Sequence, residues 1–74
     1  MSNTTQTTIA ALLTEIDQRI IGASITTRAA IAAIKDRKQN LCIGTLLPLE
    51  QDLELALSLY RAALCLHRTK GGAE

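Results

Sequence analysis

Apolar side chains occupy well over half of the helical circumference between residues 48 and 69, more than one partner helix in a short chain can cover. On a helical wheel, a broad stripe runs beside a narrower one. The broad stripe comprises Leu49, Leu53, Ala56, Leu57, Tyr60, Ala63 and Leu64, and the narrower stripe comprises Leu55, Leu59, Ala62 and Leu66. An ordinary surface helix has a single apolar stripe somewhat wider than about 100°. The segment therefore predicts a helix that packs against more than one body.

A second run of apolar residues with helical spacing precedes this segment. From Ile9 onward, apolar or small residues follow at alternating steps of four and three, the spacing of one face of a long amphipathic helix. They are Ile9, Leu13, Ile16, Ile20, Ala23, Thr27, Ala30, Ile34 and Leu41. Arg37 interrupts the pattern, but its phase continues through Gly22. We therefore predict one continuous helix over about residues 8–42.

Gly44 and Pro48 predict where the first helix ends and the second begins. Glycine takes a positive φ after a helix without steric cost, and proline is favoured in the first turn of a helix. We therefore expect a turn at residues 43–47, a second helix over about residues 48–69 and a frayed tail at residues 70–74. Because a short connection joins antiparallel neighbours, residues 1–74 are predicted to be one all-α domain, an antiparallel helical hairpin.

The size of the chain limits its stability. A single core in 74 residues is marginal without disulfides, a metal or a partner. The apolar residues are mainly Leu, Ile and Ala, with no Phe or Trp, which is typical of helix packing. We therefore expect oligomerisation or a partner protein to complete the hairpin.

The two stripes predict which faces are internal and which bind a partner. The broad stripe, with Leu53, Leu57, Tyr60 and Leu64, is expected to pack on Ile16, Ile20, Ile31 and Ile34 of the first helix. The narrower stripe then faces the partner, together with two isoleucines outside the main stripe of the first helix. The predicted partner-binding residues are Leu55, Leu59, Ala62, Leu66, Ile21 and Ile25.

No group of residues suggests catalysis, and we expect no catalytic residue, cofactor or metal site. His67 is the only histidine and has no orienting group nearby in the sequence, so we interpret it as a packing residue. Cys42 and Cys65 lie too far apart in the predicted hairpin for a disulfide and are expected to be free thiols. The chain has neither an apolar run long enough for a membrane span nor a basic amino-terminal region. These features predict a non-enzymatic, cytoplasmic protein.

The densest basic run, Lys35 to Lys38, is interpreted as the solvated end of the first helix. Cations at that end interact favourably with the helix dipole. An RNA-binding hairpin dimer is the alternative for such a run. Asp36 interrupts the run, no aromatic residue is interleaved, and the formal net charge is +1, whereas affinity for RNA depends largely on phosphate contacts. Nucleic-acid binding is therefore the less favoured prediction.

Residues 24–69 resemble the small hairpin co-chaperones of type III secretion needle subunits, of the YscE and SsaE type. The matching features are the basic end of the first helix at Lys35 to Lys38, the turn glycine Gly44, and a second helix in a Leu-Glu-x-Ala style. In that helix the matching residues are Leu53, Glu54, Ala56, Leu59, Ala63 and Leu66. The resemblance implies a bacterial cytoplasmic protein. It also implies two partners: a tetratricopeptide-like chaperone, with which the chain would pair, and the needle subunit, which the two would together keep unpolymerised.

A second interpretation needs no other protein. Two hairpins can cover each other's surplus apolar faces and form a four-helix bundle. The sequence predicts self-association of this kind, with an unknown structural or regulatory role, as the alternative to a hetero-partner.

Overall fold

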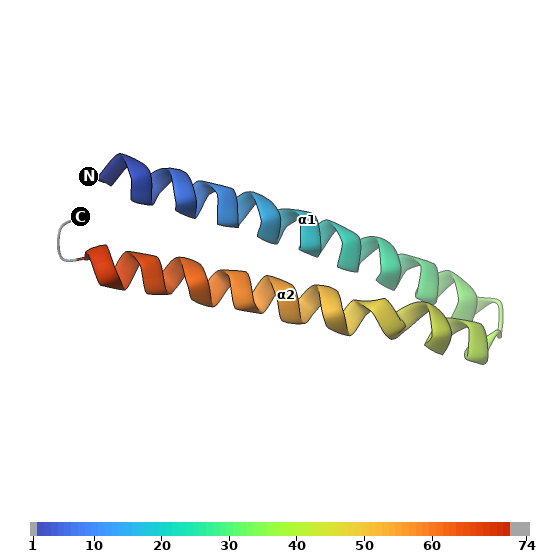
Figure 1. Ribbon diagram of the computed structural model, residues 1–74. Coiled ribbons are helices and arrows are strands. Elements are labelled where there is room, and N and C mark those ends of the chain that lie inside the picture. Colours follow the sequence, from blue (N-terminus) through green and yellow to red (C-terminus); the bar gives the residue numbers. More distant parts are fainter. Residues whose placement is uncertain (1, 72–74) are drawn as a thin grey trace.

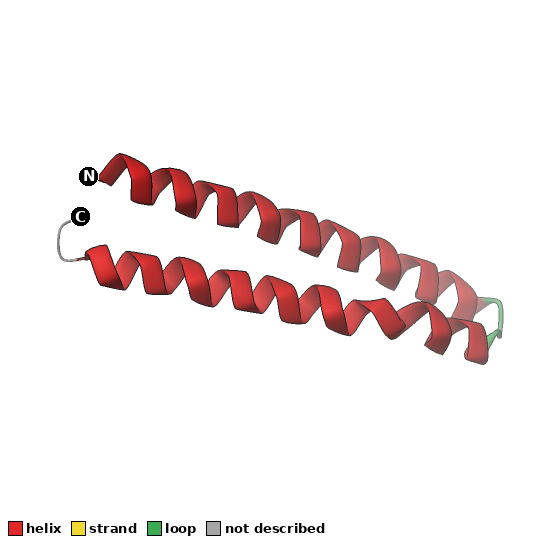
Figure 2. Ribbon diagram, in the orientation of Figure 1, coloured by secondary structure: helices red, strands yellow, loops and turns green. Residues whose placement is uncertain are grey.

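A computed structural model describes residues 2–71 and shows two long antiparallel helices, α1 (Ser2–Lys35) and α2 (Gln39–Gly71), packed against each other (Figure 1). The molecule measures 55 × 14 × 12 Å. Apart from the three-residue turn at residues 36–38, the described chain is helical (Figure 2). The predicted all-α antiparallel hairpin is confirmed, and so is the continuity of α1 through Gly22.

The predicted position of the turn is wrong. The first helix ends at Lys35 rather than near residue 42, and α2 begins at Gln39 rather than at residue 48. Arg37 takes the left-handed conformation, with φ 60°, that was expected of Gly44. Its amide donates a hydrogen bond to the Ile34 carbonyl (3.0 Å), and the Lys38 amide donates to the Ala33 carbonyl (2.9 Å). These two bonds form the Schellman pattern that closes a helix carboxyl end.

The residues expected to punctuate the chain lie inside α2. Pro48 occupies an interior position of this helix and is its tenth residue. Its ring nitrogen has no hydrogen to donate to the carbonyl four residues earlier, which belongs to Gly44. Gly44 has a negative φ, and a Cβ added there would meet no atom within 4 Å. Neither residue terminates a helix in this fold.

The outer ends of both helices lie beyond their predicted bounds. Helix α1 begins at Ser2, within a threonine-rich segment, rather than near residue 8. The Thr8 hydroxyl donates a hydrogen bond to the Thr4 carbonyl, and the Thr14 hydroxyl donates one to the Ala10 carbonyl. The donor–acceptor distance is 3.0 Å in both. Such bonds satisfy the hydroxyl within the helix. At the other end, α2 includes Lys70 and Gly71, and the remainder of the predicted tail lies outside the described residues.

The seam between the helices consists of the side chains on each helix that face the other helix. Buried or half-buried residues recur along it at alternating steps of three and four, as in a coiled coil. In α1 they are Thr5, Ile9, Leu12, Ile16, Arg19, Ala23, Thr26, Ala30 and Ala33; in α2 they are Cys42, Thr45, Leu49, Asp52, Ala56, Leu59, Ala63 and Leu66. Beside the turn, Ala30, Ala33 and Cys42 form the most buried cluster, with Leu46 packed on it.

The seam differs from the predicted one because small residues fill it. The buried apolar residues are Ala23, Ala30, Ala33, Cys42 and Ala63, and no described large side chain is fully buried. Alanines let two helix axes approach closely. The larger residues of the predicted internal faces are therefore displaced sideways, and Ile20, Leu53 and Tyr60 are each about half exposed. The expectation that these residues pack inside the hairpin is wrong.

Candidate protein-binding surface

The exposed apolar residues lie mainly on one side of the helix pair. Most of them directly follow a seam residue, for example Ile20 after Arg19 and Leu53 after Asp52. In an antiparallel helix pair, such positions on both helices project to the same side. We call this surface the Tyr60 flank. It comprises Leu13, Ile20, Ile34, Leu53, Leu57 and Tyr60, which are 44–55% exposed.

The seam edge next to the Tyr60 flank is also apolar. The seam residues on that edge include Ile16, Ala23, Leu49 and Ala56, and none of the four carries a polar side chain. The opposite edge is polar at mid-length. A continuous apolar surface therefore runs across both helices on the Tyr60 side and along much of the hairpin.

The polar edge centres on Arg19. Its guanidinium lies 3.1 Å from a Glu15 carboxylate oxygen and 3.8 Å from Asp52 Oδ1, so it links α1 to α2. The Nε atom of Arg19 is buried without a hydrogen-bond partner. Gly22 leaves room for Asp52, because a Cβ at Gly22 would stand 3.3 Å from Asp52 Oδ2. Half-exposed ion pairs contribute about 0–1 kcal/mol to stability, so this group orients the helices more than it stabilises them.

The six predicted partner-binding residues do not form one surface. Leu59 and Leu66 are half-buried in the seam, whereas Leu55, Ala62, Ile21 and Ile25 are exposed. Of the exposed four, Leu55 and Ala62 directly precede a seam residue and lie on the polar side, as does Ile25; Ile21 lies on the outer edge of α1. We call the three residues on the polar side, Leu55, Ala62 and Ile25, the Leu55 flank.

The exposure of the Tyr60 flank differs from the prediction made from the sequence. Its residues had been assigned to the interior because they are large and apolar. The available signal was the register of the alanines, since Ala23, Ala30, Ala56 and Ala63 repeat every seven residues in each helix. Such a repeat marks the line of closest helix contact better than hydrophobicity does.

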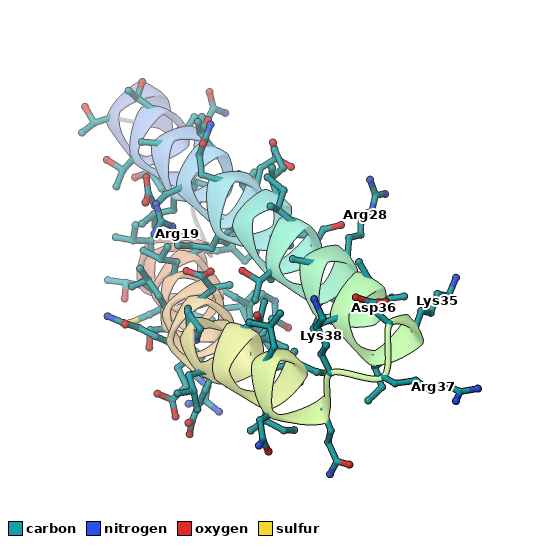
Figure 3. The ribbon with its side chains drawn as sticks, turned by 90° about the vertical axis from the view of Figure 1, so that its right-hand side faces the viewer. Arg19, Arg28, Lys35, Asp36, Arg37 and Lys38 are labelled. Atoms are coloured by element: carbon teal, nitrogen blue, oxygen red, sulfur yellow. The ribbon has the colours of Figure 1, made fainter. Side chains whose placement is uncertain are left out.

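The basic residues at the turn do not form one patch. Figure 3 shows Arg28, Lys35 and Arg37 extending away from the helix pair in different directions. The Lys38 ammonium lies 3.2 Å from an Asp36 carboxylate oxygen. Lys35 lies in the last turn of α1, as the dipole argument predicts. These residues provide solvated charge around the end of the hairpin.

Among residues 2–71 no pocket is present, and no three His, Cys, Asp or Glu side chains are placed to share a metal ion. Neither described helix has the length and apolar character needed to cross a membrane. Cys42 is buried and Cys65 is exposed, and both are free thiols, as predicted. His67 is exposed rather than packed.

Comparison with known proteins adds no relative. No family model, no curated protein and no solved structure matches this chain.

Proposed function

We propose that this chain is a non-enzymatic protein-binding module that acts as a type III secretion co-chaperone. In this role it stabilises a tetratricopeptide-like chaperone and helps to keep the needle subunit unpolymerised. The identity of the partners rests on the resemblance of residues 24–69 to such co-chaperones. The binding function rests on the structure of the hairpin.

One observation supports the binding function above all others. The seam buries small residues, while large apolar residues stay exposed along both helices. The accessible surface is 5609 Å², whereas a compact monomer of 8.0 kDa exposes about 4,450 Å². A chain with so little interior of its own gains stability when another protein covers its exposed apolar side chains.

The Leu55 flank is the surface that we assign to the chaperone. It combines exposed Ile25 and Leu55 with the Arg19 ion pairs and neighbouring polar side chains. Mixed surfaces of this kind are typical of non-obligate interfaces, which are about as apolar as the rest of a protein surface. Leu55, near mid-length on α2, is therefore the residue to test.

The experiment is capture of the tagged full-length chain from its own bacterium, followed by mass spectrometry. We expect a tetratricopeptide-like chaperone and a needle subunit to copurify in a fixed ratio. Leu55→Asp should reduce that capture at least tenfold. Leu47→Asp is the matched control, because Leu47 is 72% exposed and lies on the outer edge of α2, away from both flanks. The proposal fails if neither protein copurifies, or if both variants capture them equally.

A further inference from the structure

The Tyr60 flank is the most continuous apolar surface of the molecule. Figure 1 shows the two helices side by side over their whole length, so the flank extends across both. Leu13 and Tyr60 lie toward the open end, Ile20 and Leu53 at mid-length, and Ile34 at the turn. The ionisable residues along the outer edges of the flank include Asp17, Arg28, Glu50, Glu54 and Arg61, and His67 lies at its open end.

The size of this surface fits a second hairpin. The principal-axis extents of 55 × 14 Å give one broad face an area of about 770 Å² in projection, which is of the order of the ~800 Å² of accessible surface that each partner buries in a standard interface. The chain also exposes about 1,150 Å² more than a compact protein of its mass. Covering one whole face removes most of that excess.

The charges along the outer edges suit a copy of the same chain. Ala33 lies beside Cys42, and Gly22 lies beside Asp52. Two residues on opposite helices are therefore at the same height along the hairpin when their residue numbers add up to about 75. Asp17 then lies within one turn of the level of Arg61, and Arg28 within one turn of the level of Glu50.

A two-fold axis parallel to the helices brings these charges together. Such an axis sets α1 of one hairpin against α2 of the other at equal levels, so Asp17 comes near Arg61 and Glu50 comes near Arg28. Glu54 lies between the two pairs of charges, level with Ile21. The turns of both hairpins lie at the same end of this arrangement.

We propose that a second copy of this chain packs on the Tyr60 flank and that the two hairpins form a four-helix bundle with their turns at the same end. The shared interior then contains the large apolar side chains that a single hairpin leaves exposed. This inference goes beyond the proposed function, because it assigns a different flank to a different occupant. The Leu55 flank stays accessible on both outer sides of the dimer.

The test is the molar mass of the purified full-length chain, measured by light scattering during size-exclusion chromatography at about 100 µM and at tenfold dilutions, since association is concentration-dependent. We expect twice the 8.0 kDa of one chain at high concentration. Leu53→Asp and Ile20→Asp, on different helices, should each raise the dissociation constant at least a hundredfold, because the two-fold axis places two buried charges in one interface. Leu47→Asp should leave the mass unchanged.

Several results overturn the inference. A folded wild-type monomer at the highest concentration does so, and so does a Leu53→Asp chain that remains a dimer. If an aspartate variant does not fold, the wild type still decides, because the melting temperature of a dimer rises with protein concentration and that of a monomer does not. A wild-type monomer that loses the chaperone through Leu53→Asp would assign the flank to that partner instead. A wild-type dimer that captures no chaperone contradicts only the proposed function.

Discussion

Close packing at Ala30 makes a strong prediction about stability. Ala30 is 3% exposed and lies in one cluster with Ala33 and Cys42. Ala30→Leu adds three carbon atoms where the helices approach closely, so the helices must separate or the new side chain must take a strained rotamer. Overpacking of this kind costs about 1–3 kcal/mol. The stability of a chain of this length is about 4–11 kcal/mol, so the loss is a large part of the total.

The assay is thermal unfolding followed by circular dichroism at one fixed protein concentration. For a domain of this size, 1 kcal/mol corresponds to about 4–8 °C, so Ala30→Leu should lower the melting temperature by about 4–24 °C. Ala32→Leu is the control, because Ala32 is exposed on the same helix and Leu is nearly as good a helix former as Ala. Melting temperatures of the two variants within about 2 °C of each other would refute the close packing of the seam.

Three further substitutions test the corrected turn and seam. Pro48→Ala should raise the free energy of unfolding by about 1–3 kcal/mol, because it restores a hydrogen bond to the Gly44 carbonyl and removes a steric clash in α2. Chemical denaturation measures the gain. A loss of stability would place Pro48 outside the helix. Arg37→Gly should be more stable than Arg37→Ala by up to about 1 kcal/mol. Both substitutions remove the charge, but only glycine removes the steric strain that a Cβ causes at a positive φ. Equal stabilities of the two variants would argue against a positive φ at residue 37. Leu59→Asp should unfold the chain, whereas Leu47→Asp should keep its helicity, because Leu59 is half-buried in the seam and Leu47 is exposed. Circular dichroism measures the helicity of both variants. A folded Leu59→Asp chain would exclude this seam.

The general architecture could be predicted from the sequence because helical periodicity is a long-range signal. The phase of the apolar residues persists through Gly22, so one poor helix former does not break α1. The position of the turn could not be predicted in this way. Gly44 and Pro48 usually mark helix ends, but here the hydrogen bonds around Arg37 close α1 one heptad earlier. A charged residue in the left-handed conformation has no distinct sequence signature.

The rotation of each helix about its axis was the second feature that periodicity left undetermined. When apolar residues cover more than half of a helix, several rotations bury similar numbers of them. The choice among these rotations depends on how closely two backbones can approach, which alanine permits and isoleucine does not. Ala23 and Ala30 therefore face α2, and Ile20 and Ile34 lie beside them. The same ambiguity separated Leu59 and Leu66 from the rest of the predicted partner-binding residues.

The three-residue turn also orders the events of folding. Each layer of the seam closes a loop that is longer than the loop closed by the layer before it. Ala33 meets Cys42 across a few residues, whereas the layer containing Ile9 and Leu66 encloses most of the chain. The entropy cost of closing a loop rises with its length, and contacts that are local in sequence form fastest. The hairpin should therefore zip from the alanine-rich turn toward its open end, and amide hydrogen exchange should be slowest in the layers that close first.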